Sequence, residues 1–114
     1  MAGYRAADLS ATVYETDHSI VVELNGELDV STTGQVRDAL CRYDLEAGHD
    51  MQVDLSKLAF IDSSGMGVLV NACRRVRASG GAFSVVSEGD VLRALRVAGL
   101  EEYLTVRAAD DEMR

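Results

Sequence analysis

The chain has 114 residues, of which 47% are hydrophobic and 26% charged, and its formal net charge is −8. This length suits one domain with a single core, and the composition is that of a globular protein rather than a disordered one. Acidic residues outnumber basic ones by 19 to 11. Such a chain repels phosphate backbones and anionic lipids, so we expect no nucleic-acid partner and no membrane partner.

The sequence predicts two strands near its N-terminus. Apolar and polar residues alternate over residues 9–14 and again over residues 19–25, and the short polar segment ETDH separates the two runs. Alternation of this kind is typical of half-buried strands. We therefore expect an antiparallel pair, preceded by a loose N-terminal end.

A helix is predicted next, because apolar residues recur at positions 36, 40, 43 and 47. Ser31 or Thr32 is the expected N-cap, and Gly48 is the expected end. The later predicted elements are, in chain order, a strand over 51–55, a helix from Ser64, a strand over 82–86, a helix over 90–98 and a short strand over 103–106. The first of these helices is expected to bury Leu69, Ala72, Cys73 and Val76. The second is expected to bury Val91, Leu92, Leu95 and Ala98.

Strands that alternate with helices predict crossover connections and parallel neighbouring strands. The fold class is therefore α/β, with a mixed four- to five-stranded sheet. Because the strands alternate instead of being apolar throughout, we expect the helices to pack mainly on one face. We expect a single domain over residues 1–114, with its core over about 9–107 and both ends loose.

The segment FIDSSGMGVLV, residues 60–70, holds the candidate site. Asp62 and Ser63 fall between a predicted strand and a predicted helix, at the carboxyl end of a parallel strand, where open α/β sheets usually carry function. Either side chain can cap the helix, which is worth about 1 kcal/mol. Gly65 and Gly67 cost up to about 1 kcal/mol each relative to alanine inside a helix, which indicates close backbone approach or tight packing on the sheet.

Three kinds of chemistry at these serines were compared. A serine nucleophile needs a base, and the sequence offers only His18 and His49, neither within a recognisable motif; DSSGMG is also not G-x-S-x-G. A phosphate-cradling loop lacks its Walker-type lysine and its full glycine motif, although amides at a helix N-terminus can hold an anion. A phosphorylated serine adds about −1.5 to −2 charges at a helix end that tolerates an anion, and it opposes any partner docked there. Capping, anion binding and phosphorylation stay open at this point, and no catalytic residue is expected.

Two further expectations concern cysteine chemistry and location. Cys41 and Cys73 form no CxxC motif and lie on or beside predicted apolar helix faces, so we expect free thiols and no metal site. No apolar run approaches the roughly 18 residues of a membrane span, and the first residues lack the apolar centre of a signal peptide. We expect a cytoplasmic protein.

Four motifs together resemble those of a known family. They are GELDVST at 26–32, FIDSSGMGVLV at 60–70, RASGGAFSVV at 77–86 and VLRALRVAGLEEYL at 91–104. In this order they are similar to the motifs of the anti-sigma factor antagonists, which are single STAS domains. The resemblance implies the STAS fold and a regulatory role in bacterial transcription.

The resemblance further implies a partner-switching mechanism. The unphosphorylated chain would bind an anti-sigma factor that is also a serine kinase and so release its sigma factor. Phosphorylation at Ser63 would end that binding, and a serine phosphatase would restore the active form. ATP and magnesium belong to the kinase, so neither a cofactor nor a metal is expected on this chain, and the chain is expected not to be an enzyme.

The same resemblance implies which residues meet the partner. Asp29, the acid of the GELD segment, is expected near Ser63. Ser64 is expected to cap or to pack, and the partner surface is expected to include Asp29, Asp62, Ser64, Gly65 and an exposed Met66. The alternative is a STAS module that binds a protein or a small ligand without regulation by phosphorylation.

Overall fold

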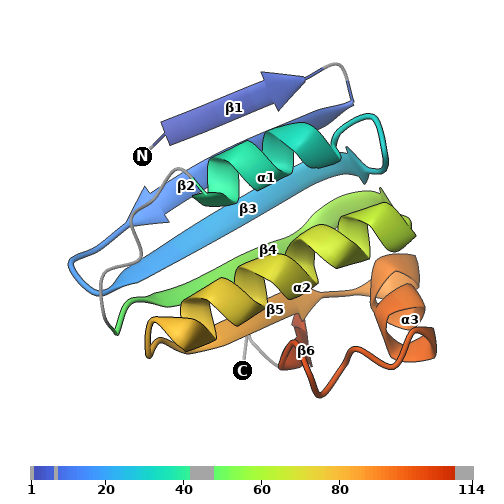
Figure 1. Cartoon of the computed structure of the whole chain (residues 1–114). Helices are drawn as coiled ribbons and strands as arrows, with labels where there is room; N and C mark the ends of the chain where they lie inside the picture. The colour runs from blue at the N-terminus through green and yellow to red at the C-terminus, as the bar shows by residue number, and fades with distance from the viewer. Residues whose placement is uncertain (1, 7, 42–47, 110–114) are drawn as a thin grey trace.

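The structure is a computed structural model that describes residues 2–6, 8–41 and 48–109. It is a mixed sheet with helices α1 and α2 lying along one face and α3 at the end of the sheet beside the start of α2 (Figure 1). The elements are β1 (Ala2–Ala6), β2 (Leu9–Glu15), β3 (Ser19–Leu28), α1 (Thr33–Cys41), β4 (Asp50–Ile61), α2 (Ser63–Ala78), β5 (Phe83–Ser87), α3 (Gly89–Val97) and β6 (Val106–Ala108).

Strand order in the sheet follows the chain, β1-β2-β3-β4-β5-β6. β1, β2 and β3 pair antiparallel, whereas β3, β4, β5 and β6 are parallel neighbours. The predicted mixed sheet is confirmed. Within the described residues it has six strands rather than four or five, because Ala2–Ala6 pairs with β2 in a segment that was expected to be loose. The last strand lies at Val106–Ala108 instead of 103–106.

The core lies between the sheet and the helices. In β3 the side chains of Ile20, Val22 and Leu24 are buried, while the residues between them are partly exposed on the other face. Alternation therefore packs one face of the sheet against the helices, as predicted. The buried face of α2 consists of the expected residues together with Val68 and Gly65.

One helix prediction needs adjustment, and another extends beyond the described residues. In α3, Val91, Leu92 and Leu95 are buried, but Ala98 is exposed because the helix ends at Val97. In α1, Val36 and Leu40 are buried. The predicted continuation of that helix through positions 43 and 47 lies outside the described residues.

Cys73 is a buried free thiol, as expected, and burial raises its pKa.

Strand β4 has 12 residues, more than twice the predicted length. Its alternation fails after Leu55, and its pairing with β3 shifts register between Glu23 and Asn25 and again between Gly26 and Glu27. Such bulges bend a strand and change which side chains face the core. The longer β4 carries the chain directly to Asp62.

The carboxyl ends of the central parallel strands meet at one edge of the sheet, where β3 leads into Asp29 and β4 into Asp62. His18 and His49 precede the first residues of β3 and β4, at the opposite edge. The sheet therefore separates the two histidines from the FIDSSGMGVLV segment.

Candidate functional site

The connection from β4 to α2 is a single residue, Asp62. It was expected to include Ser63, which instead begins the helix. Asp62 has extended backbone angles, and its Oδ1 accepts hydrogen bonds from the Gly65 amide at 3.0 Å and from the Ser64 hydroxyl at 2.5 Å. It is thus the side-chain N-cap that short acidic residues typically provide.

The Asp62 backbone also fixes the helix start to the neighbouring strand, because its N–H donates to the carbonyl oxygen of Leu28 at 3.2 Å. The hydrogen bonds from the Ser64 hydroxyl and the Gly65 amide lower the pKa of the Asp62 carboxyl below its ordinary value of 3.8. Asp62 is therefore ionised at neutral pH, and it places a negative charge directly before Ser63.

The two serines of the segment differ in their hydrogen bonding. Ser63 is the first residue of α2, its side chain is exposed, and within the described part of the chain no hydrogen bond engages its hydroxyl. Ser64 is partly buried, and its hydroxyl donates to Asp62. Of the two hydroxyls, that of Ser63 is therefore the more accessible. The role expected for Ser64, capping or packing, agrees with this contact.

Asp29 lies in the tight turn between β3 and α1. Its Oδ1 accepts hydrogen bonds from the Ser31 hydroxyl at 2.6 Å and from the Ser31 amide at 2.9 Å. These bonds lower the pKa of Asp29, while the negative charge of Asp62 works in the opposite direction. That electrostatic interaction indicates that the two carboxylates lie in one neighbourhood, and the expected proximity of Asp29 to Ser63 stays a prediction.

Thr32 immediately precedes α1, at the predicted N-cap position, but its hydroxyl does not bond the amides of the helix. Thr32 accepts a hydrogen bond from the Asp29 amide at 2.9 Å and donates one to the carbonyl oxygen of Glu27 at 2.9 Å, so its side chain closes the turn instead. Ser31 is engaged with Asp29. The amides of Gln35 and Val36 bond the Thr32 carbonyl oxygen. The turn that presents Asp29 is therefore held by its own side chains.

Glycines 65 and 67 have different roles. A Cβ at Gly65 would lie 2.7 Å from Leu28 Cγ and 3.0 Å from both the Leu28 carbonyl oxygen and Ile61 Cγ1, whereas a Cβ at Gly67 would meet nothing within 4 Å. Gly65 thus lets α2 begin directly against the ends of β3 and β4. It is buried and offers little to a partner, in contrast to the expectation for the docking surface. Met66, expected to be exposed, is partly buried against the core.

Neither histidine can serve Ser63 as a base. The two rings lie 6.4 Å apart at the amino edge of the sheet, and His49 Nε2 lies 2.8 Å from the carbonyl oxygen of Asp17. His49 directly precedes the first residue of β4 and Ser63 follows shortly after its last, so the length of a 12-residue strand lies between them. A serine nucleophile needs its base within hydrogen-bond reach, which this geometry does not provide.

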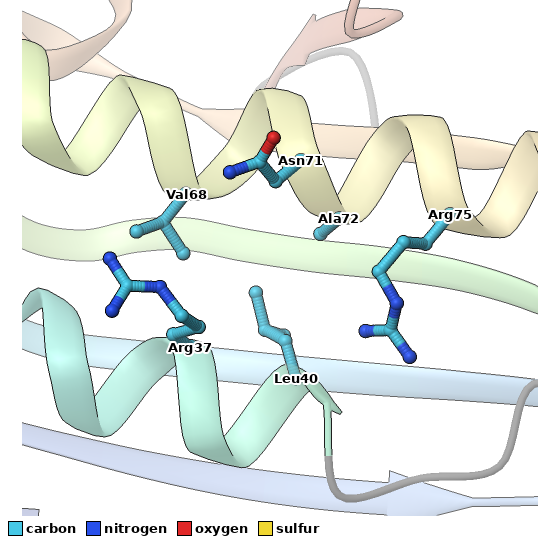
Figure 2. Close-up of a pocket in the computed structure, with 6 residues that line it drawn as sticks. All are labelled: Arg37, Leu40, Val68, Asn71, Ala72 and Arg75. Atoms are coloured by element: carbon cyan, nitrogen blue, oxygen red, sulfur yellow. The ribbon is translucent and has the colours of Figure 1, made fainter.

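A concave site between α1 and α2 is lined by Arg37, Leu40, Val68, Asn71, Ala72 and Arg75 (Figure 2). Figure 2 shows the two arginine side chains on either side of Leu40. The cavity measures only about 20 Å³, which is room for about one water molecule. A small-molecule ligand usually occupies several hundred Å³, so this site does not favour a ligand-binding function.

Three exposed apolar side chains, two of them close in sequence to Asp29 and Asp62, were missed from the sequence. They are Val30, Phe60 and Val97, which are 78%, 48% and 84% exposed. Val30 follows Asp29, and Phe60 lies two residues before Asp62. The available signal was the run of four apolar residues at 58–61, because a strand with one buried face cannot bury all four of them.

The element order, the mixed sheet with one face covered by helices, and the polar junction at the carboxyl edge define an α/β domain of the STAS type. The STAS domain model matches residues 10–113. The anti-sigma-B factor antagonist of Listeria monocytogenes is 30% identical over 100 residues, which are 87% of this chain and 87% of that protein. The chain belongs to the STAS domain family, and its relatives there are anti-sigma factor antagonists.

Solved structures share the fold. An anti-sigma factor antagonist from Mycobacterium paratuberculosis superposes with a TM-score of 0.76 at 24% identity, covering 96% of each chain. The Bacillus cell fate determinant SpoIIAA in its phosphorylated form superposes with a TM-score of 0.65 at 22% identity, covering 91% of this chain and 99% of the other.

Across the described residues, no helix has the length and apolar character needed to span a bilayer.

Proposed function

We propose that this chain is an anti-sigma factor antagonist controlled by phosphorylation at Ser63. In the unphosphorylated form it binds an anti-sigma factor that is also a serine kinase, and the kinase then releases its sigma factor. Phosphorylated Ser63 ends the complex. A serine phosphatase returns the chain to its binding form, and the whole cycle takes place in the cytoplasm on a single domain.

The observation that carries this proposal is the exposed Ser63 hydroxyl at the N-terminus of α2, next to a Ser64 hydroxyl that is already bonded to Asp62. A kinase needs a hydroxyl that can enter its active site without breaking the local structure. Ser63 meets that need, whereas Ser64 would first have to give up a 2.5 Å hydrogen bond and the cap that it supports.

The phosphoryl transfer requires nothing from this chain except the hydroxyl. The Ser63 oxygen would form a bond to the γ-phosphorus of ATP as the bond to the β-phosphate oxygen breaks, and the hydroxyl proton would pass to a base of the kinase. ATP and magnesium are held by the kinase. This agrees with the distance of both histidines from Ser63, because no base is then needed on the antagonist.

Release of the partner follows from charge. A phosphate on Ser63 would directly follow the ionised Asp62, whose charge is also felt by Asp29. The first turn of α2 favours an anion by about 0.3–1 kcal/mol, so the fold tolerates the group. A partner that covers the same surface has to bury it, at a cost on the order of 2–5 kcal/mol, equivalent to an affinity loss of about 30-fold to several thousand-fold.

The docking surface proposed here consists of Asp29, Asp62, Ser63, Ser64 and the exposed part of Met66. Gly65 supports it from beneath by bringing α2 against Leu28. That SpoIIAA, which shares this fold, has been solved in a phosphorylated form supports the view that the fold accommodates the modification. The competing function is a STAS module that binds a protein or a small ligand without regulation by phosphorylation, and the cavity between α1 and α2, at about 20 Å³, gives no support to a small ligand at that place.

The test is to incubate the purified chain with the anti-sigma factor kinase encoded in the same genome and with ATP, and then to locate the added phosphate by peptide mass mapping. We expect one phosphate on the wild type and on Ser64→Ala, and none on Ser63→Ala. A pull-down of the same kinase should succeed with the unmodified chain and fail with the phosphorylated one.

Two outcomes would refute the proposal. Modification that persists in Ser63→Ala and disappears in Ser64→Ala would move the site to the second serine. A kinase that never binds the unmodified wild type would remove the regulatory function itself.

A further inference from the structure

The two helices that cover the sheet differ in charge from the rest of the chain. α1 and α2 together carry four arginines, Arg37, Arg74, Arg75 and Arg77, and a single acid, Asp38. The whole chain has the opposite balance, with 19 acidic and 11 basic residues and a net charge of −8. All four arginines are exposed. The outer side of the helix layer is therefore a basic surface on an acidic protein.

Two of these arginines border the concave site between α1 and α2, which we call the α1–α2 groove. Arg37 contributes from α1 and Arg75 from α2, and Figure 2 shows their side chains on either side of Leu40. The floor of the groove is apolar, because Leu40, Val68 and Ala72 are buried there. Among the described residues, no acidic side chain lines it.

The positions of the two arginines are not both explained by helix stability. Arg75 lies in the last turn of α2, where a cation interacts favourably with the helix dipole. Arg37 lies in the middle of α1, where the dipole offers nothing comparable. Arg37 also forms no ion pair with another described residue. Its guanidinium at the groove is therefore available to an external group.

The chemistry of the groove favours carboxylates. A guanidinium is a planar fork with five N–H donors, and it pairs with a carboxylate through two parallel hydrogen bonds. Because it has five donors, each arginine can take an external carboxylate in addition to a contact within the chain. The apolar floor shields one side of such a pair from water, which makes the pair stronger than a fully exposed one.

Size and net charge indicate what carries these carboxylates. The cavity of about 20 Å³ is too small for a small-molecule ligand, so the carboxylates have to be presented from outside the groove. A long polyanion such as a nucleic acid would be repelled by the net charge of −8. A short acidic protein segment that lies along the two helices contacts the basic surface alone.

We propose that the α1–α2 groove binds an acidic segment of a partner protein, with one carboxylate on Arg37 and a second on Arg75. This site is separate from the helix start that carries Ser63, because Arg75 lies about 18 Å farther along α2 at roughly 1.5 Å per residue. The inference does not depend on phosphorylation of Ser63.

The experiment titrates the isotope-labelled chain with a short synthetic peptide rich in glutamate and follows the Nε–Hε signals of the arginines by NMR. The same peptide with glutamine in place of glutamate is the ligand control. We expect the glutamate peptide to shift the Arg37 and Arg75 signals in a saturable way, and the glutamine peptide to leave them unchanged. High salt should abolish the shifts, because it screens charges at a surface.

Variants assign the binding to the groove. Arg37→Gln and Arg75→Gln should each weaken peptide binding by about threefold or more. Arg74→Gln is the matched control, because Arg74 is exposed on the same helix, directly before Arg75, but does not line the groove. It removes the same charge and should bind nearly as the wild type does. Arg37→Lys keeps the charge and should bind more tightly than Arg37→Gln, and thermal melting checks that each variant is folded.

Three results would overturn the proposal. Equal weakening by Arg74→Gln would indicate attraction to the general charge of α2. Tighter binding of a short single-stranded RNA than of the glutamate peptide, at the same arginine signals, would make the groove a nucleic-acid site. A changed oligomeric state of Arg37→Gln, with unchanged peptide binding, would make it an interface between copies of this chain. None of these results bears on phosphorylation of Ser63, which the kinase assay tests separately.

Discussion

Two adjacent serines at the start of α2 differ in their hydrogen bonding, and the difference can be measured through the carboxylate that one of them bonds. The Ser64 hydroxyl is the largest cause of the lowered pKa of Asp62. We predict that Ser64→Ala raises the Asp62 pKa toward its ordinary value, as followed by carbon-detected NMR titration of the side-chain carboxyl.

The sign of the effect on stability follows from that direction. A carboxyl whose pKa is lower in the folded state stabilises the fold at pH values above its ordinary pKa of 3.8, and this stabilisation is lost as the pH falls through the folded value. Ser64→Ala should therefore lower the free energy of unfolding at pH 7. The difference from the wild type should become smaller as the pH falls below the pKa of Asp62.

Ser31→Ala is the matched control for this prediction. It removes the hydroxyl that bonds Asp29, so it should raise the Asp29 pKa and leave that of Asp62 nearly unchanged. An Asp62 titration that is the same in the wild type and in Ser64→Ala would contradict the hydrogen-bonding pattern described for the site.

At the scale of the elements, the junction of α2 with the sheet depends on one glycine and not on its neighbour. We predict that Gly65→Ala destabilises the fold by about 1–3 kcal/mol, because the new methyl group would overlap the Leu28 side chain and crowd Ile61. Gly67→Ala should stabilise it by roughly 0.5–1 kcal/mol, because that position is helical, exposed and open.

Urea unfolding of the two variants checks this pair directly. Both changes add the same methyl group to the same helix. Helix propensity alone would therefore change the free energy of unfolding of both variants in the same direction. Equal stabilisation by both would show that α2 does not approach the end of β3 as closely as the structure has it.

Much of the order of strands and helices could be predicted, because the spacing of apolar side chains along the chain shows which face of each element is buried. The alternation in β2 and β3 and the apolar face of α2 were correct, and so was the parallel arrangement of the central strands. β1 escaped prediction because alanine and glycine in Ala2–Ala6 have little strand preference of their own. The second half of β4 was missed because its bulges break the alternation.

The site was predictable where it depends on chain topology, and not where it depends on how elements meet. Asp29 and Asp62 follow adjacent parallel strands, so their proximity follows from the order of the sheet. The burial of Gly65, the partial burial of Met66 and the exposure of Phe60 depend on the angle at which α2 and α3 meet the sheet. Local sequence patterns do not specify that angle.

At the scale of the whole molecule, a charge at Ser63 should change binding without changing the fold. We predict that Ser63→Asp keeps its free energy of unfolding within about 1 kcal/mol of the wild type, because the helix N-terminus offsets part of the repulsion from Asp62. The same variant should bind the anti-sigma factor kinase at least about 30-fold more weakly.

Ser63→Asn separates charge from size, since its side chain has the same shape as that of aspartate and is neutral. It should remain folded and bind the kinase more tightly than Ser63→Asp, as measured by calorimetry beside a thermal melt. If Ser63→Asp loses its melting transition together with its binding, the residue is primarily a structural part of the helix start.

The one-residue connection between β4 and α2 has a consequence for how such a signal travels. Asp62 forms hydrogen bonds with Leu28 on one side and with Gly65 on the other. The connection is therefore too short and too firmly held to adopt a second conformation. Under the proposed function, a phosphate at Ser63 therefore acts on the partner through its charge on a fixed surface. The rate of switching is then set by phosphoryl transfer and by dissociation of the partner, and not by a rearrangement of the domain.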